Sequence, residues 1–135
     1  MTDLKISVGT DITEVGRIER SLKNPRFFEK VFGKTEKEYL LSKKGEAFCR
    51  SAAARFAAKE AFGKAVGTGV SGFGLQEVEV VNDDSGCPHI VLSGRAAQKF
   101  KNREFSVSIS HTGNYATATV LAVTEDGNEQ KDRLS

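Results

Sequence analysis

The sequence predicts an α+β domain in which a mainly antiparallel sheet packs against one long central helix. An alanine-rich run without proline extends from Glu46 to Val66 and stops at Gly67, which is typical of a long helix with a glycine C-terminus. Segments of alternating apolar and polar residues lie on both sides of this run. Two of them, 77–81 and 88–92, flank the turn-forming segment 82–86, which indicates an antiparallel hairpin.

Before the long helix, the sequence predicts one strand and three short helices. Apolar and polar residues alternate over Leu4–Val8, so we expect a half-buried strand that ends at Gly9–Asp11. A helical period starts at Ile12, and Asn24–Pro25 is a cap and first turn for a second helix. The segment Thr35–Glu38 has the form of a capping box and predicts the start of a third.

After the hairpin, the sequence predicts a brief helix over 95–101 and two further strands. The strand Phe105–Ser110 has one serine face, and His111 follows it. The final strand, Tyr115–Val123, is apolar with alanine and threonine on both faces, which suits packing between subunits. We assign residues 1–123 to one domain and expect residues 124–135 to be a polar, disordered tail.

Composition excludes several classes of protein. A length of 135 residues fits one domain, and a net charge of +2 excludes a strongly basic nucleic-acid-binding protein. The two cysteines, Cys49 and Cys87, form neither a C-x-x-C motif nor a disulfide framework, which favours a reducing compartment. The chain has no apolar run of membrane-span length and no signal-peptide core. We therefore expect a cytoplasmic protein that binds neither nucleic acid nor membrane.

Four polar residues do not fit simple packing: Asp11, Glu60, Lys64 and His111. Glu60 and Lys64 are one helical turn apart, a pairing that contributes only about 0.2–0.5 kcal/mol. Burial of an unpartnered carboxylate costs more, so Glu60 lies either at a solvated edge or opposite a cation in a cleft. Asp11, at a predicted strand end, is either a helix cap or a metal ligand.

These residue types favour one chemistry over others. Two carboxylates are too few for a zinc site, but they suit Mg²⁺ when phosphate oxygens and water complete its octahedron. Lys64 and His111 can then neutralise or hydrogen-bond a diphosphate. No serine–histidine–acid context supports a hydrolase triad.

Four motifs in order resemble those of the holo-acyl-carrier-protein synthases, the small 4′-phosphopantetheinyl transferases. The resemblance covers the chain from about Ile6 to Val123. The motifs are Val8-Gly9-Thr10-Asp11-Ile12 with Arg17; Arg55-Phe56-Ala57-Ala58-Lys59-Glu60-Ala61-x-x-Lys64-Ala65-x-Gly67-x-Gly69; Gly86-x-Pro88; and Ser108-Ile109-Ser110-His111.

The resemblance implies transfer of 4′-phosphopantetheine from coenzyme A to a serine of apo-acyl-carrier protein in fatty-acid biosynthesis, with release of adenosine 3′,5′-bisphosphate. It implies Mg²⁺ on Asp11 and Glu60, and a catalytic group of Glu60, Lys64 and His111. The base that accepts the serine proton is open between a water near the metal, Glu60 and His111; we favour water, because a carboxylate on Mg²⁺ is a poor base. The implied coenzyme A contacts are Lys64, His111, Arg55 and Pro88.

The resemblance also implies a carrier-protein surface and a homotrimer with active sites between protomers. Arg17 falls on the docking position, and Arg20, Lys23 and Arg26 extend a basic face. Phe27 is either an exposed docking residue or part of the core. Two alternatives are a larger pseudo-dimeric transferase, which needs about twice this length, and a non-catalytic module that binds a nucleotide or a protein partner. Both carboxylates and Lys64 are present, which argues against the non-catalytic module.

Overall fold

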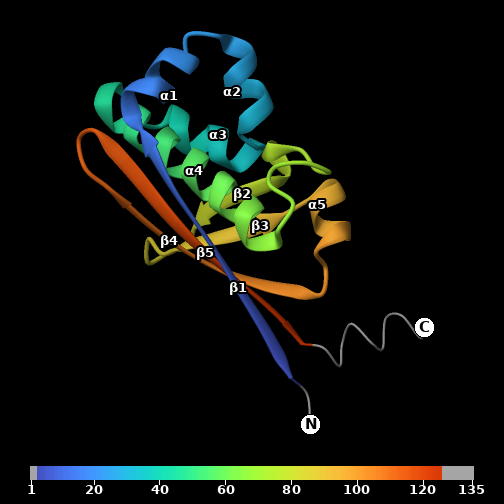
Figure 1. Cartoon of the computed structure of the whole chain (residues 1–135). Helices are drawn as coiled ribbons and strands as arrows, with labels where there is room; N and C mark the ends of the chain where they lie inside the picture. The colour runs from blue at the N-terminus through green and yellow to red at the C-terminus, as the bar shows by residue number, and fades with distance from the viewer. Residues whose placement is uncertain (1–2, 126–135) are drawn as a thin grey trace.

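The computed structural model describes residues 3–125 (Figure 1). None of its helices in this range is long and apolar enough to span a membrane. In chain order the elements are β1 (Leu4–Glu14), α1 (Val15–Ser21), α2 (Pro25–Val31), α3 (Lys34–Leu41), α4 (Gly45–Val66), the 3₁₀ turn η1 (Leu75–Glu77), β2 (Val78–Asn82), β3 (Pro88–Leu92), α5 (Gly94–Lys99), β4 (Arg103–His111) and β5 (Tyr115–Glu125).

The strands form two antiparallel sheets, which confirms the predicted α+β class. The larger sheet has the order β1-β5-β4, and the smaller one is the β2-β3 hairpin. Figure 1 shows α4 lying across the larger sheet, with α1, α2 and α3 grouped at one end of it. β5 extends to Glu125, so Thr124 and Glu125 belong to the sheet, not to the predicted tail. The rest of that tail lies outside the described residues.

The long helix is buried on most of its sides. It ends at Gly67, whose φ of 84° is the left-handed conformation that glycine adopts without strain. Small alanine side chains allow the sheet to approach one side, while Phe62 fills the space towards the hairpin and α5. A second cluster packs α1, α2 and α3 against the first half of α4 around Ile18 and Phe32. The helix thereby joins the larger sheet and the hairpin on one side to the first three helices on the other.

The edge strand β1 of the larger sheet turns its apolar residues to the unexpected side. The prediction that the first strand is half-buried through its apolar residues is wrong, because they face away from α4. The side chains of Leu4, Ile6, Val8 and Ile12 are 58%, 63%, 57% and 65% exposed. Over residues 116–123, β5 does not carry alanine and threonine on both faces: its alanines face α4, and Thr117 and Thr119 face outward. Thr124, beyond that range, is buried on the alanine face.

Two local predictions are also corrected. Asp11 lies within β1, paired with Ala118, and neither ends the strand nor caps a helix. The third helix begins at Lys34, and Glu36 accepts a hydrogen bond from the Gly33 N–H at 3.0 Å. The predicted box from Thr35 to Glu38 is therefore displaced by two residues.

Candidate active site at the crossing of β1 and α4

A close approach of backbone to backbone brings the candidate residues together. A β-carbon at Gly9 would collide with the Ala61 carbonyl and lie 2.6 Å from the Ala65 nitrogen, so only glycine permits this contact. Two residues earlier, the Ser7 hydroxyl donates to the Ala65 carbonyl at 2.6 Å. β1 therefore rests directly on the last turns of α4.

This crossing places Asp11 beside Lys64. The Lys64 ammonium donates to the Thr10 carbonyl at 2.8 Å and lies 3.4 Å from Asp11 Oδ1. The other carboxylate oxygen, Oδ2, accepts from the Thr13 hydroxyl at 2.7 Å. The Lys64 side chain is 56% exposed, so one of its three N–H donors remains directed to solvent and available to a phosphate oxygen.

Glu60 joins the group from the preceding turn of α4. Burial raises the pKa of its carboxyl, and the nearby charge of Asp11 raises it further, while Arg17 and Lys64 partly oppose the shift. Two carboxylates that disfavour each other's charge are stabilised together by a divalent cation. Oxygen donors of this kind suit Mg²⁺, so the residues present fit the predicted metal.

His111 does not reach this group within one chain. It ends β4, on the far side of β5 from β1, and its pairing partner is Ala116. Asp11 pairs instead with Ala118, two residues further along β5. Two strand spacings alone separate the backbones by roughly 10 Å. The His111 side chain is exposed at the end of the sheet.

Comparison with known proteins identifies the family. The model of the 4′-phosphopantetheinyl transferase superfamily matches residues 7–120. A holo-[acyl-carrier-protein] synthase of Treponema denticola is 43% identical over 119 residues, which cover 86% of this chain and 96% of that protein. The chain belongs to the 4′-phosphopantetheinyl transferase superfamily.

Solved structures agree with this assignment. A holo-(acyl-carrier-protein) synthase of Bacillus anthracis in complex with CoA superimposes with a TM-score of 0.79 at 34% identity, covering 90% of this chain and 99% of that one. A coenzyme A complex from Helicobacter pylori has a TM-score of 0.74 at 29% identity, covering 85% and 98%. The resemblance predicted from the motifs is confirmed, and so is the fold of a small transferase of this superfamily.

The other two predicted coenzyme A contacts lie elsewhere in this transferase fold. Arg55 is only 5% exposed and stacks on the Tyr39 ring, with its guanidinium carbon 4.2 Å from the ring centroid. Burial lowers the pKa of this guanidinium, and its Nε has no hydrogen-bond partner among the described residues. Pro88 begins β3, opposite Asn82. Their roles towards coenzyme A stay predictions.

The predicted carrier-protein residues lie on α1, on α2 and in the turn between them, with different exposures. Arg17 is exposed, with its guanidinium carbon 5.5 Å from the centre of the Phe56 ring. Phe27 is half-buried, with its ring centroid 5.9 Å from that of Phe56, so it belongs to the second packed cluster. Arg20 forms an exposed ion pair with Glu14 at 3.8 Å. Lys23 and Arg26 are exposed as well.

Sequence reasoning missed a buried charge pair on the same helix. The Lys59 ammonium contacts Glu36 Oε1 at 2.6 Å and donates to the carbonyls of Leu75 and Val78 at 3.0 and 2.6 Å. Burial raises the pKa of Glu36 and lowers that of Lys59, and each partner opposes the other's shift. No local signal marked Glu36, because its partner lies 23 residues away.

Proposed function

We propose that this chain transfers 4′-phosphopantetheine from coenzyme A to a serine of apo-acyl-carrier protein. The observation that carries the proposal is the group of Asp11, Glu60 and Lys64 at the crossing of β1 and α4. Relatives named holo-[acyl-carrier-protein] synthase, some solved with coenzyme A, support the choice of substrates. We also propose a role in fatty-acid biosynthesis in the cytoplasm.

In the proposed reaction the serine Oγ attacks the β-phosphorus of coenzyme A. A new Oγ–P bond forms, the P–O bond to the α-phosphate breaks, and adenosine 3′,5′-bisphosphate leaves with that electron pair. Lys64 donates its free N–H to the diphosphate and balances the charge that grows on the leaving oxygen. Thr13 and the Thr10 carbonyl hold Asp11 and Lys64 in position.

We propose that Asp11 and Glu60 hold Mg²⁺ in this reaction. When bound, the ion supplies Lewis-acid stabilisation of the diphosphate charge. The serine proton leaves to a water in the site, because Glu60 is a poor base while it serves as a ligand. Its raised pKa makes Glu60 a second candidate base when no cation is present. His111 is better suited to holding a phosphate.

We propose a homotrimer with active sites between protomers. The outer face of the larger sheet exposes Leu4, Ile6, Val8 and Ile12 on one edge strand, with Leu121 of β5 beside them. A continuous apolar sheet face at an edge is an aggregation hazard unless another chain covers it. Such an assembly also gives His111 a route to the Asp11 group of a neighbouring copy, which one chain does not offer.

The assembly is tested by light scattering. The wild type should be a trimer, and Ile6→Glu should dissociate it. Val91→Glu is the matched control, because Val91 is a 47% exposed apolar residue on β3, outside the larger sheet. A wild type that is monomeric and fully active at nanomolar concentration would contradict the trimer.

The proposed reaction is tested by incubating apo-acyl-carrier protein with this chain, coenzyme A and Mg²⁺, followed by intact mass spectrometry. The carrier should gain one phosphopantetheine group, and the carrier with its serine changed to alanine should not. An unchanged carrier mass together with measurable coenzyme A binding would support the non-catalytic binding module instead.

A further inference from the structure

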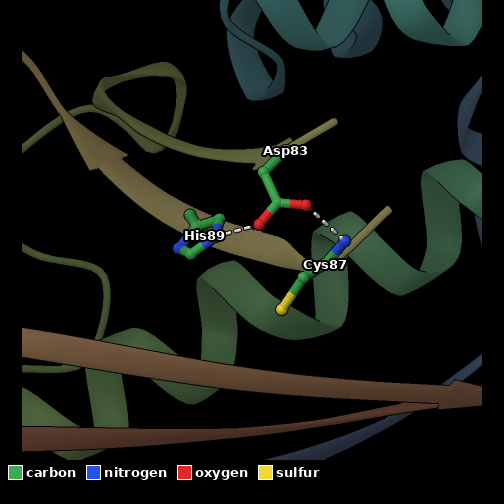
Figure 2. Close-up of side chains that lie close together, drawn as sticks. All are labelled: Asp83, Cys87 and His89. Carbon is green, nitrogen blue, oxygen red and sulfur yellow. Dashed lines mark hydrogen bonds and ion pairs between the residues drawn. The ribbon is translucent and has the colours of Figure 1, made fainter. Parts of the chain in front are cut away.

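Three side chains of the kinds that bind transition metals meet at the turn of the β2-β3 hairpin. Asp83 follows β2, Cys87 immediately precedes β3, and His89 is the second residue of β3. One potential ligand atom from each lies within 4.8 Å of the other two. Figure 2 shows the Asp83 carboxylate between the His89 ring and Cys87. All three residues are exposed, so an ion from solvent can reach them.

The backbone of the turn sets this arrangement. The Gly86 N–H donates to the Asp83 carbonyl at 2.9 Å, and the Asp83 N–H donates to the Cys87 carbonyl at 2.8 Å. Gly86 has a φ of 87°, which favours glycine at the end of such a turn. Cys87 immediately precedes β3 and His89 is its second residue, and their ligand atoms lie within 4.8 Å of each other.

The two oxygens of Asp83 have different tasks. Oδ1 accepts from the backbone N–H groups of Ser85 and Cys87, both at 2.9 Å, and from the Ser85 hydroxyl at 2.7 Å. These bonds orient the carboxylate, as outer hydrogen bonds orient metal ligands in known sites. Oδ2 faces the His89 ring, with Nε2 at 2.8 Å. One oxygen is therefore anchored, and the other lies next to an imidazole nitrogen.

We propose that Asp83, Cys87 and His89 bind a divalent transition-metal ion of the zinc class, with water as a fourth ligand. Tetrahedral coordination with ordinary bond lengths places the ligand atoms roughly 3.3–3.8 Å apart. Metal binding therefore has to lengthen the distance from Asp83 Oδ2 to His89 Nε2 slightly from 2.8 Å. It also has to bring the Cys87 sulfur, now within 4.8 Å of the other two ligand atoms, closer to them. Exposed side chains make such shifts by small rotations.

The donor types separate this site from the one at the β1–α4 crossing. Sulfur, nitrogen and oxygen together select Zn²⁺ or Co²⁺ over Mg²⁺, whereas Asp11 and Glu60 offer only oxygen. Binding replaces the hydrogen bond between Asp83 and His89 and releases the thiol proton of Cys87. The proposed ligands are thus separate from Asp11 and Glu60, although Pro88, a predicted coenzyme A contact, lies between Cys87 and His89 in the sequence.

The test is a Co²⁺ titration of the untagged full-length chain, kept reduced with a phosphine and free of other thiols. One equivalent per chain should produce the near-ultraviolet band of a thiolate bound to Co²⁺, together with the strong visible bands of tetrahedral coordination. Zn²⁺ should displace both. Cys87→Ser should abolish the thiolate band, and His89→Gln should weaken binding by at least about tenfold.

Matched variants identify the ligands. Cys49→Ser removes the other cysteine, which lies on α4, and should leave the band unchanged. Asp11→Asn should also leave it unchanged, because an oxygen-only site gives no thiolate band. A wild type without the band, a band that survives Cys87→Ser, or a band that needs two chains per ion would each overturn the proposal. Circular dichroism checks that each variant is folded.

Discussion

Lys59 and Lys64 lie five residues apart on α4, and each pairs with a carboxylate from another element in an opposite environment. Lys59 and Glu36 are 2.6 Å apart, and both side chains are fully buried. Lys64 and Asp11 are 3.4 Å apart, with side chains that are 56% and 17% exposed. Lys59 uses its three donors on Glu36 and two carbonyls, whereas Lys64 keeps donor capacity for a ligand. Burial and hydrogen-bond saturation, more than residue type, distinguish the two pairs.

The largest effect on stability is expected at the buried pair. Lys59→Met should cost about 3–5 kcal/mol of unfolding free energy, because it leaves the Glu36 carboxylate buried without its counter-charge. Lys64→Met is the matched control and should cost no more than about 1 kcal/mol, since the Lys64 side chain is exposed to solvent. Urea denaturation at one fixed protein concentration measures both.

A double variant sharpens this difference. Lys59→Met combined with Glu36→Gln should be less destabilised than the sum of the single variants, because neither partner then carries an unpaired buried charge. Additive losses would mean that the Lys59 and Glu36 side chains contribute independently and do not act as a coupled pair.

The next largest effect is expected on the transfer reaction at the group formed by Asp11, Glu60 and Lys64. Asp11→Ala or Glu60→Ala should lower the transfer rate about 10²–10³-fold, because the diphosphate charge loses its stabilisation. Excess chelator should act on the wild type in the same way. Glu38→Ala, an exposed carboxylate on α3, is the control and should be unaffected. Full activity in chelator would remove the metal from the mechanism.

The sequence was sufficient to predict the long helix and the hairpin, because local signals dominate there. The alanine run and Gly67 define the end of α4, and the Asn82–Gly86 segment leaves the chain few conformations other than a turn. The presence of two family motifs in one chain also predicted that Asp11, Glu60 and Lys64 lie in one site. The crossing at Gly9 brings Asp11 within 3.4 Å of Lys64.

Long-range contacts explain what the sequence did not predict. The segment from Ile12 to Glu14 fits a helical period locally, but pairing with β5 from Tyr115 to Thr117 keeps it in the strand. Alternation in β1 predicted that its apolar face is buried, but the close contact at Gly9 turns the other face towards α4. Glu36 was missed because its partners at Lys59 and Val80 are distant in the sequence.

A smaller effect is expected for Arg17, a cationic side chain that belongs to neither lysine–carboxylate pair. Arg17→Ala should raise the Michaelis constant for the carrier protein by no more than about fivefold and leave that for coenzyme A unchanged, since exposed ion pairs contribute about 0.2–1 kcal/mol. Added salt should mimic the variant in the wild type. Lys30→Ala, an exposed cation at the end of α2, is the control. If Arg17→Ala weakens coenzyme A binding instead, the residue belongs to the nucleotide site.

The smallest effect concerns the pH dependence of Glu60 without metal. Its pKa in the folded chain is raised by burial and then by Asp11, so the folded state holds this proton more tightly than the unfolded state does. The resulting stability is present below the unfolded pKa of about 4.3 and is lost as pH rises through the raised value. Glu60→Gln stays neutral throughout. In chelator it should therefore gain stability over the wild type as the pH rises, by less than about 1 kcal/mol because the site is partly solvated.

Urea denaturation of both chains in chelator between pH 4 and 8 measures this difference, with Glu38→Gln as the control for an exposed carboxylate. At neutral pH, Mg²⁺ should make the wild type more stable than Glu60→Gln, because the ion stabilises the charged pair of carboxylates and has one ligand fewer in the variant. If Mg²⁺ stabilises neither the wild type nor Glu60→Gln, then Asp11 and Glu60 do not share a cation. The group of Asp11, Glu60 and Lys64 would then differ from the Lys59–Glu36 pair only in its exposure to solvent.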